Sequence, residues 1–315
     1  MPTDADSPGR GGFPPLRPAQ LAAGAAVEHH PGSVADPVTQ GPPMSVPRSV
    51  ESARRPMFIR PRKTNIHIHV QGPQDGPPVL LLHSLGTNHH VWDPQAEVLA
   101  RRFRVIRPDM RGHGLSEAPP GPYGMEDLAD DAFAVLDALG VGRCFVGGVS
   151  IGGMIAQTMA LKAPHRVGGL VLVDTSMATA VPAMWRERAG QVRASSVAPF
   201  ADAITARWVT QGFADSPEMQ GLRTMLHQTA AEGFAGCAEA LATADLSARV
   251  GDIAAPSLVI VGDQDQSTPV AAAQALCAAL KGTLVVLPDA AHIPNLEQPA
   301  RLADTMLRFL SAQSS

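Results

Sequence analysis

The sequence predicts an α/β fold, with a mainly parallel central sheet and helices on both of its faces. Short, continuous apolar runs recur along the chain, as in strands that are buried on both faces. Stretches of helical character separate these runs, and strands joined through helices form right-handed crossovers between parallel neighbours. One long segment interrupts the alternation, which indicates an insertion into the sheet architecture.

The expected elements follow in chain order. The strands are residues 64–70, 78–83, 103–107, 144–149, 170–173, 258–261 and 283–287. The helices are residues 93–101, 125–139, 153–162, 270–280 and 298–309. Residues 177–250 contain no strand-like run and have a helical character, so we expect a helical lid over the carboxyl edge of the sheet.

The N-terminal segment differs from the rest of the chain. Pro and Gly account for 16 of the first 50 residues, and aliphatic clusters are few. Such a segment buries too little apolar surface to offset the entropy lost on ordering. We therefore expect residues 1–55 to be a disordered extension and residues 56–315 to form the folded domain.

Composition excludes several classes of protein. A net charge of -4 does not favour a nucleic-acid partner. No run approaches the roughly 20 apolar residues of a membrane span, and we find no secretory signal. The three cysteines are far apart and indicate neither a disulfide framework nor a metal site. We expect a cytoplasmic protein that works without a metal or another cofactor.

Residues 148–152 read Gly-Val-Ser-Ile-Gly and fit the pattern G-x-S-x-G. They lie between an expected buried strand and an expected helix, which is the context that a nucleophilic serine requires. The serine of this pattern sits on a cramped turn, where side chains at the flanking positions would collide with the neighbouring backbone. Ser150 is therefore the candidate nucleophile.

A serine hydroxyl needs a base to accept its proton. In this arrangement the expected chain order is serine, then an acid, then histidine. His292 follows the last expected strand, whereas His165 and His227 lie in helical regions. His292 is therefore the candidate base.

The acid should follow the preceding strand, where it can orient the imidazole. Residues 262–269 (GDQDQSTP) supply two carboxylates there. We favour Asp265, which lies farther past the strand end, and interpret Asp263 as a turn former. Asp174, at the end of an earlier strand, remains a second alternative.

The negative oxygen of a tetrahedral intermediate needs two backbone N–H donors. We expect one from Ile151 at the start of a helix and one from Leu85 in the loop after residues 78–83. His83 is expected to shape that loop through hydrogen bonds. His89 and His90 are expected at the surface, without partners for a metal.

Several segments together resemble one family, the bacterial 3-oxoadipate enol-lactonases. They are His83-Ser-Leu-Gly, residues 109–116 (DMRGHGLS), Gly121-Pro-Tyr, residues 150–154 (SIGGM), residues 289–292 (DAAH), and the lid segments 232–238 (EGFAGCA) and 244–246 (ADL). The likeness extends over about residues 58–312. It implies an α/β-hydrolase fold and a cofactor-free step of the β-ketoadipate pathway, in which 3-oxoadipate enol-lactone is opened to 3-oxoadipate.

A substrate of this kind is a small anionic lactone, and its carboxylate calls for a cation in the pocket. The lid offers candidates, because the arginine fork can hold a carboxylate in two places. The candidate substrate-binding residues are Trp185, Arg186, Arg188, Arg207 and Trp208.

Other functions remain open on the same fold, because fold does not determine substrate. One is a general hydrolase of small esters, lactones or carbon–carbon bonds. Another is a cofactor-free perhydrolase that uses peroxide as acceptor. The third is a ligand sensor without catalytic turnover.

Overall fold

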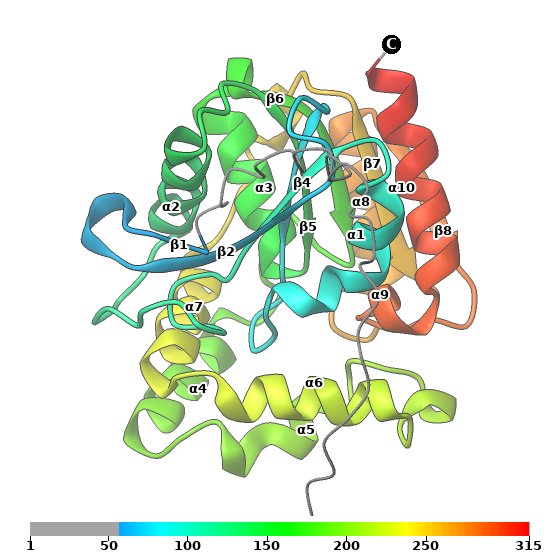
Figure 1. Cartoon of the computed structure of the whole chain (residues 1–315). Coiled ribbons are helices and arrows are strands. Elements are labelled where there is room, and N and C mark those ends of the chain that lie inside the picture. Colours follow the sequence, from blue (N-terminus) through cyan, green and yellow to red (C-terminus); the bar gives the residue numbers. More distant parts are fainter. Residues whose placement is uncertain (1–56, 315) are drawn as a thin grey trace, which may run out of the picture. The chain divides into compact units, whose positions relative to one another are not determined.

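Eight strands form one sheet in the order β1-β2-β4-β3-β5-β6-β7-β8 (Figure 1). The computed structural model describes residues 57–314, so the expected extension of residues 1–55 lies outside the described residues. The strands are β1 (Phe58–Ile59), β2 (Ile66–Gln71), β3 (Pro78–Leu82), β4 (Arg104–Pro108), β5 (Cys144–Val149), β6 (Val167–Val173), β7 (Ser257–Gly262) and β8 (Thr283–Leu287). β1, β2 and β4 pair antiparallel, and all pairs from β4 to β8 are parallel.

Helices cover both faces of the sheet and one of its ends. They are α1 (Asp93–Leu99), α2 (Met125–Ala138), α3 (Ile151–Lys162), α4 (Pro182–Ala194), α5 (Ala201–Thr205), α6 (Pro217–Gln228), α7 (Ala231–Thr243), α8 (Val270–Leu280), α9 (Pro294–Glu297) and α10 (Pro299–Gln313). α1 and α10 pack against each other on one face, while α2 packs against α3 on the other (Figure 1).

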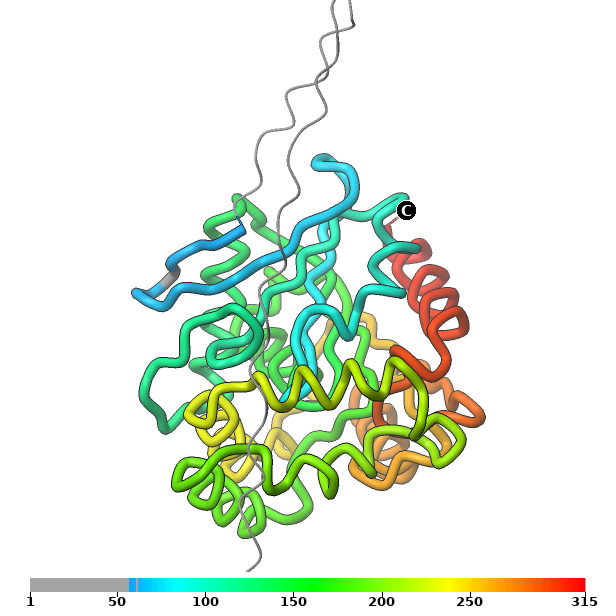
Figure 2. Tube along the Cα trace, turned by 60° about the horizontal axis from the view of Figure 1, so that its bottom comes forward, coloured from blue at the N-terminus to red at the C-terminus, as the bar shows by residue number. Residues whose placement is uncertain are grey.

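The four helices α4 to α7 form a cap between β6 and β7 in the chain. α4 packs against α7. The cap lies beyond the carboxyl ends of the parallel strands, and Figure 2 turns this end toward the viewer. The segment expected to act as a lid, residues 177–250, contains these four helices.

The structure confirms the expected α/β architecture, because the strands and helices named from sequence appear in the expected order. Their ends differ by a few residues, most at α10, which continues to Gln313. Two short elements, β1 and α9, were not expected. Within residues 57–314, no helix combines the length and apolar character that crossing a bilayer requires.

Candidate active site

Ser150 occupies a strained turn between β5 and α3. Its backbone has φ 57° and ψ -121°, a conformation that residues other than glycine rarely adopt. Strain of this kind costs on the order of 1–3 kcal/mol and persists only where surrounding structure holds it. The central strands provide that support, because the Ser150 N–H donates to the Val173 carbonyl of β6 at 3.0 Å.

The two glycines of the G-x-S-x-G pattern allow this turn to form. A Cβ atom on Gly148 would lie 2.2 Å from backbone atoms of Gly152. A Cβ atom on Gly152 would lie 2.4 Å from the Leu82 carbonyl oxygen of β3. Both contacts involve backbone and cannot be relieved by moving a side chain, so each position requires glycine.

His292 and Asp265 follow β8 and β7, and the structure brings them together. Nδ1 of His292 lies 2.9 Å from Oδ2 of Asp265. The same carboxylate accepts the Thr268 hydroxyl at 2.6 Å and the backbone N–H groups of Ser267 and Thr268 at 2.7 and 3.1 Å. Burial alone would raise the pKa of Asp265, but the charge of His292 and these hydrogen bonds hold it well below its usual range. A carboxylate held in this way keeps Nδ1 protonated and leaves Nε2 able to accept a proton.

The other acids and histidines weighed from the sequence lie elsewhere or play another part. His165 and His227 are exposed, and so is Asp263, whose carboxylate accepts a loop N–H at 3.3 Å. Asp174 is fully buried close to Asp265. Of these acids, Asp265 is therefore the one whose hydrogen bond to a histidine is present in the structure.

A cavity of about 320 Å³ lies between the cap and the carboxyl ends of the strands. From the sheet side, Ser84, Leu85, Ser150, Ile151, Thr268 and His292 line it. From the cap, Trp185, Arg188, Ile204, Arg207, Trp208 and Leu241 line it. Its volume is typical of a pocket for a small molecule. Ser150 and His292 therefore line the same cavity as these cap residues.

The backbone around Ser150 offers hydrogen-bond donors to this cavity. Within residues 57–314, the N–H groups of Leu85 and Ile151 have no hydrogen-bond acceptor. Both residues line the cavity, and Ile151 is the first residue of α3, where N–H groups lack intrahelical partners. Two such donors on either side of a nucleophile can hold a negatively charged oxygen.

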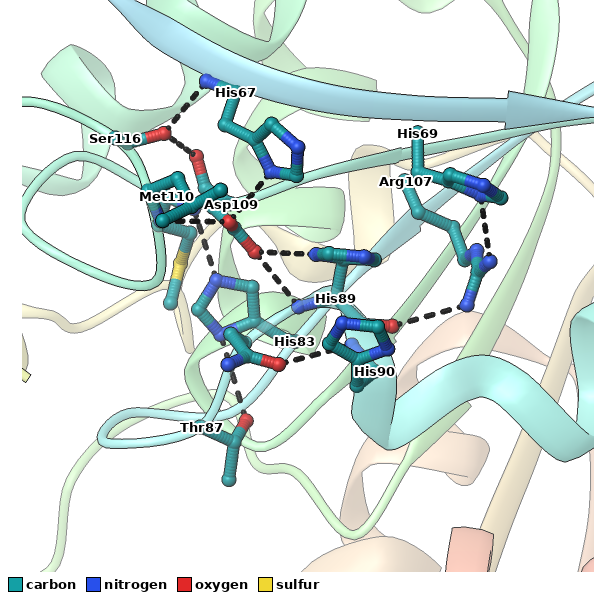
Figure 3. Close-up of polar contacts among 12 residues, drawn as sticks. His67, His69, His83, Thr87, His89, His90, Arg107, Asp109, Met110 and Ser116 are labelled. Atoms are coloured by element: carbon teal, nitrogen blue, oxygen red, sulfur yellow. Dashed lines mark hydrogen bonds and ion pairs between the residues drawn. The ribbon is translucent and has the colours of Figure 1, made fainter. Parts of the chain in front are cut away.

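Two buried histidines anchor the loop that carries Leu85. Nε2 of His83 accepts the Met110 N–H at 2.9 Å, and Nε2 of His113 accepts the Gly86 N–H at 3.1 Å (Figure 3 shows His83). Burial lowers the pKa of His83 to about 3 and that of His113 to about 4. Both imidazoles are therefore neutral at pH 7, as an acceptor nitrogen requires. His83 thus shapes the loop through hydrogen bonds.

The expectation that His89 lies at the surface is wrong. Its side chain is buried and its Nδ1 lies 2.9 Å from Asp109, which also contacts Nδ1 of His67 at 2.8 Å (Figure 3). The backbone N–H groups of His89 and Leu115 complete the set of donors to this carboxylate. The three side chains have metal-ligating atoms within 4.8 Å of one another, but a metal ion would have to displace the protons of these hydrogen bonds. His90 is exposed, as expected.

Four of the five candidate substrate-binding residues line the cavity. They are Trp185, Arg188, Arg207 and Trp208. The inclusion of Arg186 is corrected, since it is not among the lining residues and its guanidinium donates to the Ala242 carbonyl at 3.4 Å. Arg188 lies over the Phe200 ring at 4.5 Å, and in the described part of the chain no carboxylate pairs with it. Arg207 donates to a backbone carbonyl at 2.7 Å.

Hydroxyl groups in the cavity wall were not predicted from the sequence. Ser84, Ser176 and Thr268 all line it. For Thr268 a signal was available, because a residue three positions after Asp265 in a tight turn can donate to that carboxylate. The other two hydroxyls carry no spacing that distinguishes them from surface residues.

Comparison with known proteins gives a consistent result. Residues 77–200 match the family model described as alpha/beta hydrolase fold. The chain is 38% identical over 230 residues to 3-oxoadipate enol-lactonase 2 of Acinetobacter baylyi, which covers 72% of this chain and 86% of the relative. The solved enol-lactonase of Burkholderia xenovorans LB400 superposes with a TM-score of 0.78 at 33% identity, covering 81% of this chain and 99% of that one. A thermophilic esterase of Thermogutta terrifontis, solved with malate bound, gives a TM-score of 0.78 at 31% identity and covers 82% and 98%.

Proposed function

Because the chain belongs to the α/β-hydrolase family and is related to its 3-oxoadipate enol-lactonases, we propose that it opens 3-oxoadipate enol-lactone to 3-oxoadipate. The proposed nucleophile is Ser150, the base His292 and the acid Asp265. The N–H groups of Leu85 and Ile151 are the proposed oxyanion donors. The reaction needs no metal or other cofactor in this scheme.

One observation carries the choice of an anionic substrate: the position of Arg188. Arg188 lines the same cavity as Ser150, its guanidinium packs on the Phe200 ring, and it has no carboxylate partner among residues 57–314. Burial lowers the pKa of Arg188, which reflects the cost of holding an unpaired cation there. A substrate carboxylate would offset that cost through two hydrogen bonds. The enol-lactone carries such a carboxylate on its carboxymethyl group.

In the proposed acylation step all three residues take part. His292 Nε2 takes the proton of the Ser150 hydroxyl, and the serine oxygen forms a bond to the lactone carbonyl carbon. The carbonyl oxygen becomes negative and accepts hydrogen bonds from Leu85 and Ile151. Asp265 stabilises the imidazolium that His292 has become.

Collapse of this intermediate breaks the ring bond between the carbonyl carbon and the ring oxygen. The departing oxygen is an enolate, so it leaves easily, receives the proton from His292 and settles as a ketone. His292 then takes a proton from a water molecule, which attacks the ester on Ser150. The second collapse returns the serine proton and releases 3-oxoadipate.

The test compares substrates that differ in one charge. We expect the enol-lactone to be hydrolysed at least about a hundredfold more efficiently than its methyl ester, a difference of roughly 2.7 kcal/mol in transition-state binding. Arg188→Gln should remove most of this preference and leave hydrolysis of p-nitrophenyl acetate nearly unchanged. The measurement is kcat/KM for the three substrates.

Arg186→Gln is the matched control, because Arg186 is on the same helix but outside the cavity lining. It should retain the preference. Equal rates on the acid and the methyl ester, with Arg188 without effect, would instead favour a general esterase. The related malate-bound esterase of Thermogutta terrifontis makes that the second candidate. Higher activity with peroxide as acceptor would identify a perhydrolase.

A further inference from the structure

A second carboxyl group lies beside the pair formed by Asp265 and His292. Asp174 directly follows β6 and has a left-handed backbone with φ 42°, and none of its surface is exposed. One oxygen of Asp174, one oxygen of Asp265 and a ring nitrogen of His292 all lie within 4.8 Å of one another. The catalytic scheme above uses only two of these three groups.

The hydrogen bonds show which carboxyl group carries the negative charge. Asp265 accepts four donors, whereas Asp174 accepts only the Gly262 N–H at 2.9 Å. Among residues 57–314, Oδ2 of Asp174 is buried and accepts no hydrogen bond, while the Asp174 side chain lies close enough to Asp265 to share a hydrogen bond with that carboxylate. Two carboxyl groups this close in a buried site do not both ionise, because each negative charge disfavours the other. Burial and the charge of Asp265 both raise the pKa of Asp174 well above its usual range.

We propose that Asp174 is a neutral carboxylic acid beside Asp265 and serves as a reserve acid that can orient His292 when Asp265 is lost. In the wild type Asp174 adds no second charge to the site, and Asp265 alone orients His292. This inference rests on the proposed roles of His292 and Asp265.

Removing Asp265 should change the charge of Asp174. In Asp265→Ala the neighbouring negative charge is gone and space opens beside the imidazole. Asp174 then loses its proton to solvent, and its carboxylate can accept the Nδ1–H of His292 directly or through one water molecule. The groups that face Asp174 in that variant are His292 and Glu297, whose carboxylate accepts backbone N–H groups of Thr210 and Ala291.

A double-mutant cycle tests this role, with p-nitrophenyl acetate as substrate so that the outcome does not depend on the lactone assignment. Asp174→Asn alone should keep kcat/KM within about threefold of wild type, because an amide resembles a neutral acid. Asp265→Ala should retain residual activity. Adding Asp174→Asn to it should remove at least about a further tenfold, far more than in the wild-type background.

Two measurements separate a positioning role from a merely structural one. Residual kcat/KM of Asp265→Ala should rise with pH along one ionisation that the double variant lacks. The infrared difference spectrum of wild type minus Asp174→Asn at pH 7 should contain the carbonyl band of a protonated carboxylic acid. Asp263→Asn is the matched control, and its effect should be the same with and without Asp265.

The proposal would be overturned if Asp174→Asn had the same effect with and without Asp265, or if the residual kcat/KM of Asp265→Ala did not depend on pH. A carboxylate band in the difference spectrum, in place of the band of a protonated acid, would overturn it as well. Activity that survives Ser150→Ala in a chain with Asp174 and Asp265 intact would instead overturn the proposed function, so the two failures are distinguishable.

Discussion

Ser150 keeps an unfavourable backbone conformation because two neighbouring strands and two glycines constrain the turn on which it lies. Strand β6 accepts its N–H, and the flanking glycines approach each other and β3 so closely that no Cβ atom fits. The turn presents the hydroxyl to a cavity that His292 also lines. At the scale of a single residue, the strained backbone places Ser150 at the cavity wall, as the proposed nucleophile requires.

Replacing that hydroxyl tests the assignment. Ser150→Ala should fold with a melting temperature close to wild type, since the backbone contacts are unchanged. Hydrolysis should fall by several orders of magnitude, on the scale of ~10⁶. A serine-directed phosphonate should label Ser150 in the wild type, as read by mass spectrometry of the peptide, and His292→Ala should suppress the labelling. Activity within tenfold of wild type would exclude this serine as the nucleophile.

The elements around the site could be predicted where burial leaves a pattern. All six residues of β5 are buried, and the resulting apolar run can be recognised in the sequence itself. β1 consists of two residues, too few to show a period. The G-x-S-x-G pattern around Ser150 could be recognised by its fixed spacing. The burial of His89 could not be predicted in this way, because its partner Asp109 lies 20 residues away in the chain.

Helix geometry explains why the sequence alone could not show which of the two α4 arginines lines the cavity. Arg186 and Arg188 are two residues apart on α4 and therefore point to different sides of the helix. Which side faces the cavity depends on how α4 docks onto α7 and the sheet. That docking involves contacts far apart in the chain, which leave no local signal in the sequence.

The loop that carries Leu85 depends on neutral histidines, and this makes folding sensitive to acid. The pKa values of His83 and His113 are about 3 and about 4, lowered by burial from the 6.5 of an exposed imidazole. The unfolded chain therefore binds more protons below pH 6.5. Each histidine should lower the free energy of unfolding by about 1.4 kcal/mol per pH unit as the pH falls from 6.5 toward its folded pKa.

Urea denaturation at pH 7, 6 and 5 measures this slope. His113→Gln can still accept the Gly86 N–H but does not titrate, so it should reduce the slope by about one proton. His165→Gln changes an exposed histidine and should leave the slope as in wild type. An unchanged slope in His113→Gln would mean that this imidazole does not titrate on unfolding.

At the scale of the whole molecule, the cap is joined to the rest of the domain through Glu232 of α7. Its carboxylate accepts the Gly121 N–H at 2.7 Å and pairs with Arg193 of α4, which also pairs with Glu239. These groups are partly exposed, so each pair contributes about 0–1 kcal/mol. The cap therefore depends mainly on its buried apolar residues, such as Leu222 and Phe234.

Those apolar contacts, the sheet and the cavity all belong to residues 57–314. Residues 1–55 are rich in Pro and Gly and contain few aliphatic clusters that a core would need. Deleting them should leave the melting temperature and kcat/KM unchanged within error, because a segment of this composition offers few residues to a core. Differential scanning calorimetry and the p-nitrophenyl acetate assay on the two chain lengths give the comparison. A fall of several degrees on truncation would show that the segment packs on the domain, and a change in KM alone would place it near the mouth of the cavity.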